Sequence, residues 1–142
     1  MNVLNVDTLL KSLEDKKNKS LLNLDLTHVK TQKMNILRQL YLSKHVTHDL
    51  LTKLDQYMFV DEMPDMKYGS YIRTIHMIDP DHITLSSGGF VCDIKVEDKG
   101  IVILCKNRLN HFFQIVMHEH LIFRKLKEQE LTLLYALEHI HR

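Results

Sequence analysis

Two histidines flank a glutamate at His118-Glu119-His120, and no other short pattern in the chain is closer to a metal site. Residues two apart on a strand point to the same side, so the two imidazoles could share a ligand. Zinc needs four ligands, and no cysteine or aspartate cluster at ligand spacing supplies the rest, although His76, His82 and His111 could converge on the pair. The sequence therefore favours a polar turn here, and predicts no metal site and no cofactor.

Cysteine and carboxylate chemistry are the other catalytic possibilities. Cys92 and Cys105 both stand among apolar residues, which raise the pKa of a thiol and make it a poor nucleophile. A group of acidic residues matches no twelve-residue calcium loop and is typical of a solvated rim. These residues are Asp61, Glu62, Asp65, Asp79 and Asp81. We expect no catalytic residues and no enzymatic activity.

Aromatic and basic residues that could bind nucleic acid recur in the second half of the chain. Small barrels present such residues on an open sheet face, where bases stack and phosphates are neutralised. The candidates are Tyr68, Tyr71, Arg73, Arg108, Phe112 and Arg124. The formal net charge of +1 and the absence of tryptophan argue against this function, and the sequence favours Phe90, Phe112, Phe113 and Phe123 as core residues.

The elements that must position these residues belong to one ordinary domain of 142 residues. Hydrophobic residues make up 44% and charged residues 26%, as in soluble globular chains. No apolar run is long enough for a membrane span. With no signal peptide apparent, we expect reduced cysteines and a reducing compartment.

Residues 1–60 predict a helical region. Its first part is a short amphipathic helix, which either docks on a partner or folds back on the core. The apolar residues of this helix are Val3, Val6, Leu9, Leu10 and Leu13. Two further helices are expected over Asp25–Tyr41, with Lys33 turned away from the apolar face, and over Thr47–Phe59, with Thr47 as N-cap. A C-terminal helix is expected over 127–142.

Residues 66–126 predict an antiparallel β unit, because all four glycines lie there among short alternating apolar runs. In one strand, Phe90, Cys92, Ile94 and Val96 should share the dry face. Strands are expected over Ser70–Ile78, His82–Leu85, 90–97, Ile101–Cys105, Phe112–Met117 and Leu121–Lys125. The fold class is therefore α+β. We expect five or six strands in a small SH3-like or OB-like barrel or, alternatively, in a bent sheet. The sheet and the flanking helices are expected to pack as a single domain.

Three short motifs of this region resemble small proteins of nucleocytoplasmic large DNA viruses. They are Tyr68-Gly69-Ser70-Tyr71-Ile72-Arg73, Gly88-Gly89-Phe90 and Ile122-Phe123-Arg124-Lys125-Leu126. The resemblance covers residues 66–130, although the chain lacks the tryptophan expected near Phe112-Phe113. It implies a virion-associated structural role and transfers no active-site residues.

Two functions of different class follow. The first is a structural interaction protein, such as a minor component of a viral particle or another large assembly, located in the virion or in the cytoplasm or nucleus of a host cell. The alternative is a barrel-type nucleic-acid binder. The interaction candidates are the five apolar residues of the first helix together with Tyr71, Arg73, Arg108 and Arg124.

Overall fold

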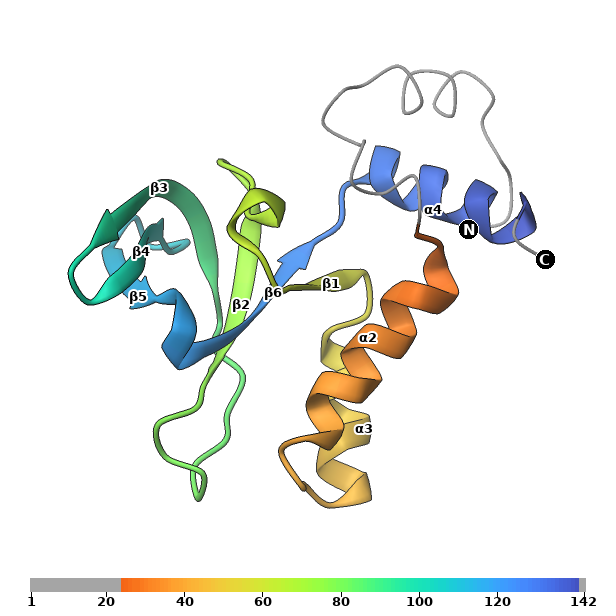
Figure 1. The fold of residues 1–142 in the computed structure, drawn as a ribbon, viewed down its shortest axis with the longest axis horizontal. Coiled ribbons are helices and arrows are strands. Elements are labelled where there is room, and N and C mark those ends of the chain that lie inside the picture. The colour runs from red at the N-terminus through yellow and green to blue at the C-terminus, as the bar shows by residue number, and fades with distance from the viewer. Residues whose placement is uncertain (1–23, 141–142) are drawn as a thin grey trace. The chain divides into compact units, whose positions relative to one another are not determined.

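The computed structural model describes residues 24–140 of the chain. They fall into two compact units (Figure 1): one contains the residues up to Leu42 together with those from Leu126 onward, and the other is Ser43–Lys125. The expected helix at Met1–Leu13 lies outside the described residues. That the two units pack as a single domain stays a prediction.

The first unit contains helices α2 (Leu26–Arg38) and α4 (Glu128–Ile140). The Asp25 carboxylate caps α2 by accepting a hydrogen bond from the His28 N–H at 2.8 Å. The Thr27 N–H donates to Glu138 of α4 at 3.0 Å, so the start of α2 is tied to α4. Both helices were expected, and α2 ends three residues before the predicted Tyr41.

One prediction for α2 was wrong. Lys33 lies on the buried face, because Val29, Lys33 and Leu37 follow one another at four-residue intervals and so share one side of the helix. The long aliphatic stem of a lysine can cover apolar surface, so a buried helix face does not exclude this residue.

The second unit begins with helix α3 (Lys44–Lys53), which is shorter than predicted. Its N-cap is Ser43, not Thr47, and the Ser43 hydroxyl accepts from the Val46 N–H at 3.2 Å. The predicted extension to Phe59 was wrong, because Gln56 adopts a left-handed conformation (φ 65°) and the following Tyr57–Val60 forms strand β1.

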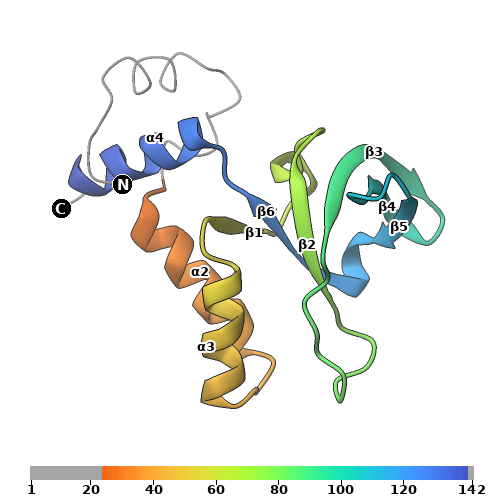
Figure 2. The same ribbon diagram turned by 180° about the vertical axis from the view of Figure 1, so that it is seen from behind.

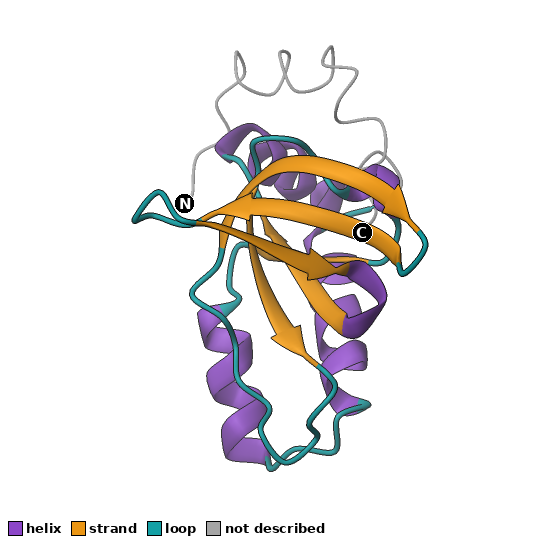
Figure 3. Cartoon of the chain, turned by 90° about the vertical axis from the view of Figure 1, so that its left-hand side faces the viewer, coloured by secondary structure: helices purple, strands orange, loops and turns teal. Residues whose placement is uncertain are grey.

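The sheet has six antiparallel strands in the order β1-β6-β2-β3-β4-β5. After β1 come β2 (Tyr71–His76), β3 (Gly89–Glu97), β4 (Gly100–Lys106), β5 (Phe112–Val116) and β6 (His120–Lys125). Of the expected run His82–Leu85, only Leu85 joins the sheet, through an isolated bridge to Ile75. No pairing joins β1 to β5 among the described residues, so the sheet is open and not closed into a barrel. Figures 2 and 3 show the bending of its long strands.

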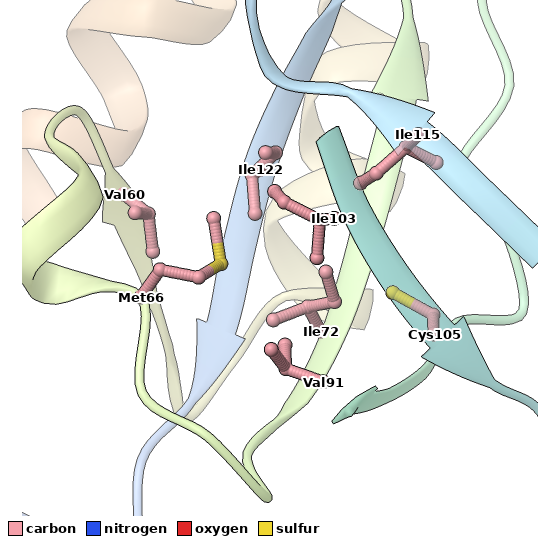
Figure 4. Packing of buried hydrophobic residues seen from close by; sticks show 8 residues of the cluster. All are labelled: Val60, Met66, Ile72, Val91, Ile103, Cys105, Ile115 and Ile122. Atoms are coloured by element: carbon pink, nitrogen blue, oxygen red, sulfur yellow. The ribbon is translucent and has the colours of Figure 1, made fainter. Parts of the chain in front are cut away.

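A hydrophobic core cluster of this unit lies on one face of the sheet (Figure 4), while Ile75, Val102 and Phe123 are buried on the other face. It is formed by Val60, Met66, Ile72, Val91, Ile103, Cys105, Ile115 and Ile122. The predicted faces of β3 were wrong at both ends: at its start Val91 is buried, whereas Phe90 and Cys92 are exposed, and near its end Val96 is 78% exposed. At the start of the strand the cause is a register shift between Val91 and Asp93, which inserts one residue into the alternation.

Candidate functional site

Strand β2 carries two of the predicted interaction residues, and the chain segment before β3 holds both in place. Arg73 donates its Nε–H to the Ser86 carbonyl oxygen at 2.8 Å. The Tyr71 hydroxyl donates to the Ser87 carbonyl oxygen. Each side chain is therefore fixed by a backbone acceptor, which orients the aromatic face of Tyr71 and the guanidinium of Arg73 before any ligand binds.

Gly88 allows this segment to lie directly against β2. Its φ of +93° is in the region that favours glycine, and an added Cβ would fall well inside contact of the Ile72 carbonyl oxygen. The same Cβ would lie 2.9 Å from Cε2 of Tyr71. Any larger residue would therefore push the segment away from β2 and disturb the Tyr71 side chain.

A tight hairpin between β4 and β5 brings Arg108 to the same place. The Asn107 side-chain oxygen accepts from the Leu109 N–H at 2.9 Å and from the His111 N–H at 3.0 Å. Asn110 completes the turn with a φ of 64°, a conformation that asparagine tolerates. At the tip of this hairpin the Arg108 guanidinium carbon stands 5.2 Å from the centre of the Tyr71 ring, a cation–π contact.

Together these residues surround a pocket of about 360 Å³. Its lining consists of Tyr57, Tyr71, Arg73, Ser87, Gly88, Asn107, Arg108 and Leu109. The lining holds two guanidinium groups and no carboxylate, and within residues 24–140 no ion pair joins either arginine to an acid. Burial raises the pKa of the Tyr57 hydroxyl, and the positive charges of Arg73 and Arg108 oppose that rise. The pocket is therefore a positively charged site with aromatic walls.

Of the sequence-predicted interaction residues, Tyr71, Arg73 and Arg108 meet in this pocket, but Arg124 does not. Arg124 is only 1% exposed. It donates from Nε to the Asp65 carbonyl oxygen at 3.1 Å and from Nη2 to the Met58 sulfur at 3.0 Å. Its side chain projects to the core face of the sheet, because in the register Arg124 pairs with the core residue Ile72. The apolar residues of the Met1–Leu13 segment lie outside the described residues.

The pocket residues that sequence reasoning missed are Tyr57, Ser87, Asn107 and Leu109. Tyr57 was assigned to a helix, and only its pairing with Lys125 in β6, far along the chain, reveals its true neighbours. The Gly88-Gly89 pair and Asn107 at the start of the hairpin are turn signals in the sequence. They do not show that the segment before β3 and the β4–β5 hairpin both lie against Tyr71.

The other chemical candidates from the sequence are the histidine motif and the two cysteines. No group of three metal-ligating side chains occurs within residues 24–140. His118-Glu119-His120 is the predicted turn: Met117–Glu119 forms a 3-10 turn (η3) and His120 begins β6. Burial raises the pKa of the Cys105 thiol to about 12, with the nearby Cys92 as a smaller influence.

No protein-family model, curated protein or solved structure matches this chain. Among residues 24–140, no helix is both long enough and apolar enough to cross a membrane. The functional argument therefore rests on the pocket and on the sheet face around it.

Proposed function

We propose that this chain is a non-enzymatic binding protein, and that its pocket binds single-stranded nucleic acid. The observation that supports this most directly is the Arg108 guanidinium over the Tyr71 ring, beside Arg73, in a lining without carboxylates. Guanidinium groups bind phosphate through paired hydrogen bonds, and an aromatic face stacks with any base. Both recognition elements of a nucleotide are present at one place.

The fixed geometry favours this ligand over a purely ionic surface contact. Arg73 and Tyr71 each donate a hydrogen bond to the backbone of residues 86–87, so little side-chain freedom is lost on binding. Arg108 is exposed at its hairpin tip and covers the tyrosine ring. A base that stacks on Tyr71 can displace the guanidinium sideways toward its own phosphate, so stacking and charge neutralisation act together.

The test is binding of a fluorescent eight-nucleotide oligothymidylate, followed by anisotropy over a series of salt concentrations. Affinity should fall steeply as salt rises, since phosphate contacts release counterions. Arg108→Ala should weaken binding by about tenfold, as expected for the loss of a charge-assisted hydrogen bond. Arg108→Lys should recover only part of the affinity, because an ammonium group lacks the planar fork.

Lys99→Ala is the matched control. It removes the same unit of charge from an exposed position in the β3–β4 turn, at the opposite end of β4. If Lys99→Ala weakens binding as much as Arg108→Ala, the oligonucleotide is attracted by overall charge and the pocket is not the site.

A structural role in a large assembly, such as a viral particle, is the second proposal. It is favoured by large apolar side chains that are exposed in the described part of the chain, among them Tyr68 at 63% and Leu109 at 74%. Such a contact would respond little to salt, in contrast to phosphate binding. Deletion of residues 1–20 should then abolish sedimentation with the assembly. If the truncated chain still sediments with it, the N-terminal segment is not the docking element.

A further inference from the structure

A row of four side chains crosses the sheet from the pocket toward its edge. In the register Tyr71 of β2 pairs with Phe90 of β3, Phe90 with Lys106 of β4, and Lys106 with Phe112 of β5. Directly paired residues project to the same face of an antiparallel sheet. The core residues Ile72, Val91 and Cys105 are their immediate chain neighbours and therefore project to the other face.

This row is aromatic and basic; its two phenylalanines are exposed, and Tyr71 and Lys106 are half-buried. Phe90 is 44% exposed and Phe112 is 61% exposed, unusually high fractions for phenylalanine. The Phe90 ring stands edge-on to Tyr71 with 5.0 Å between ring centres, and the Lys106 ammonium lies 5.7 Å from the centre of the Phe112 ring. The row is thus a continuation of the pocket, with the same pairing of cation and ring.

Charge around the row is compatible with a polyanion. The acidic residue nearest along this face of β3, Asp93, is paired with Lys95 at 3.7 Å. Lys106 ends β4 and Arg108 lies at the tip of the hairpin that follows, and neither forms an ion pair with a carboxylate within residues 24–140. A phosphate placed near either one would gain a favourable contact that no carboxylate described here provides.

The spacing of the rings restricts the form of the ligand. Neighbouring strands are about 4.8 Å apart, so Phe90 and Phe112, two strands apart, are separated by roughly 10 Å along the row. Stacked bases in a duplex are only about 3.4 Å apart along one strand. A base that stacks on a protein ring gives up the neighbouring base on that face. A nucleic acid that places one base on each ring must therefore be single-stranded, with those bases unstacked from their neighbours.

Building on the proposed function, we infer that a single strand of nucleic acid crosses β2 to β5 at right angles to the strands. Its bases stack on Tyr71, Phe90 and Phe112, and its phosphates lie against Arg73, Arg108 and Lys106. The footprint extends from the pocket to the edge strand. The aromatic contacts add affinity without reading sequence, since every base has a stacking face.

The experiment compares Phe90→Leu and Phe112→Leu with the wild-type protein, using oligothymidylates of two, four and eight nucleotides. Leucine keeps an apolar side chain of similar size but removes the ring. Each variant should bind the eight-nucleotide ligand about tenfold more weakly, as expected for the loss of one stacked base, with the salt dependence unchanged. Phe112→Trp should retain or exceed wild-type affinity.

Tyr68→Leu is the control, because it removes an exposed aromatic ring that is not part of the row. The two-nucleotide ligand should be nearly insensitive to Phe112→Leu, since it is too short to reach β5 from the pocket. A duplex of equal length should bind more weakly than the single strand.

The outcomes separate the two proposals. If Phe90→Leu and Phe112→Leu bind all ligands as the wild type does while Arg108→Ala weakens binding, the pocket is a nucleic-acid site but the path across the sheet is wrong. If the wild-type protein binds none of the oligonucleotides at low salt, both the proposed function and the path are wrong.

Discussion

Replacement of Gly88 by alanine offers a direct test of how the pocket is built, with Gly69→Ala as its matched control. Both glycines have a positive φ, +78° at Gly69 and +93° at Gly88, so each alanine variant incurs a similar backbone penalty of roughly 1–2 kcal/mol. Both variants also reduce the freedom of the unfolded chain equally. These two contributions cancel when the variants are compared.

The contacts that the new methyl group makes differ between the two variants. At Gly69 an added Cβ meets no atom within 4 Å, whereas at Gly88 it collides with the Ile72 backbone and stands 2.9 Å from the Tyr71 ring. Overpacking of this kind costs roughly 1–3 kcal/mol. With an unfolding slope of about 2 kcal/mol per molar urea, the Gly88→Ala midpoint should lie roughly 0.5–1.5 M below that of Gly69→Ala.

The assay is urea denaturation followed by circular dichroism, with oligonucleotide binding measured on the same samples. Gly88→Ala should also weaken binding, because the segment that it displaces accepts the hydrogen bonds of Tyr71 and Arg73. Equal midpoints for the two variants would refute the claim that residues 86–88 are packed tightly on β2.

Three further predictions concern the interior and its titration. The exposed Cys92 should react rapidly with a thiol reagent at pH 8, whereas Cys105 should react only on unfolding, because burial raises its pKa to about 12. Rapid reaction of both thiols in the folded protein would contradict this. Burial lowers the pKa of His120, and the stacked His76 lowers it further. Because the unfolded chain therefore binds more protons at this residue than the folded protein does, the free energy of unfolding should fall as pH drops below about 6.5. His120→Gln should flatten that dependence in urea titrations at pH 5.5 and 7.5, and an unchanged slope would show that another group is responsible. Arg124→Ala should lower the free energy of unfolding by about 2 kcal/mol or more, because it removes a large buried side chain and the donor to the Asp65 carbonyl; a near-wild-type midpoint would show that the site relaxes to fill the space.

The sequence predicted most of the helices and strands, because their patterns are local. Val29 and Leu37 mark the buried face of α2, and the continuous apolar run Ile101–Cys105 falls within β4 as predicted. Strand β1 was missed because Leu50, Leu54 and Tyr57 fit a helical period, and the pairing that makes Tyr57–Val60 a strand involves β6, more than sixty residues away. No local pattern contains such a contact.

The candidate site was predicted in part for the same reason. Tyr71 and Arg73 alternate on one strand, so their shared face could be inferred from period two. Arg124 has the same sequence signature but lies on the core face, because the register of β6 against β2 pairs it with Ile72. The exposure of Phe90 depends on the register shift at Cys92, and a bulge leaves no clear mark in the residue types.

The short hairpin between β4 and β5 has a consequence for how this protein could diversify. Residues 107–112 supply Arg108, Leu109 and Phe112 to the outer surface, and none of them belongs to the core cluster. Substitutions or changes of length at this tip should preserve the fold while replacing the guanidinium of Arg108 and the ring of Phe112. Ligand preference could thus evolve through one exchangeable loop of five residues, 107–111, and the first residue of β5, with Tyr71 and the rest of the sheet unchanged.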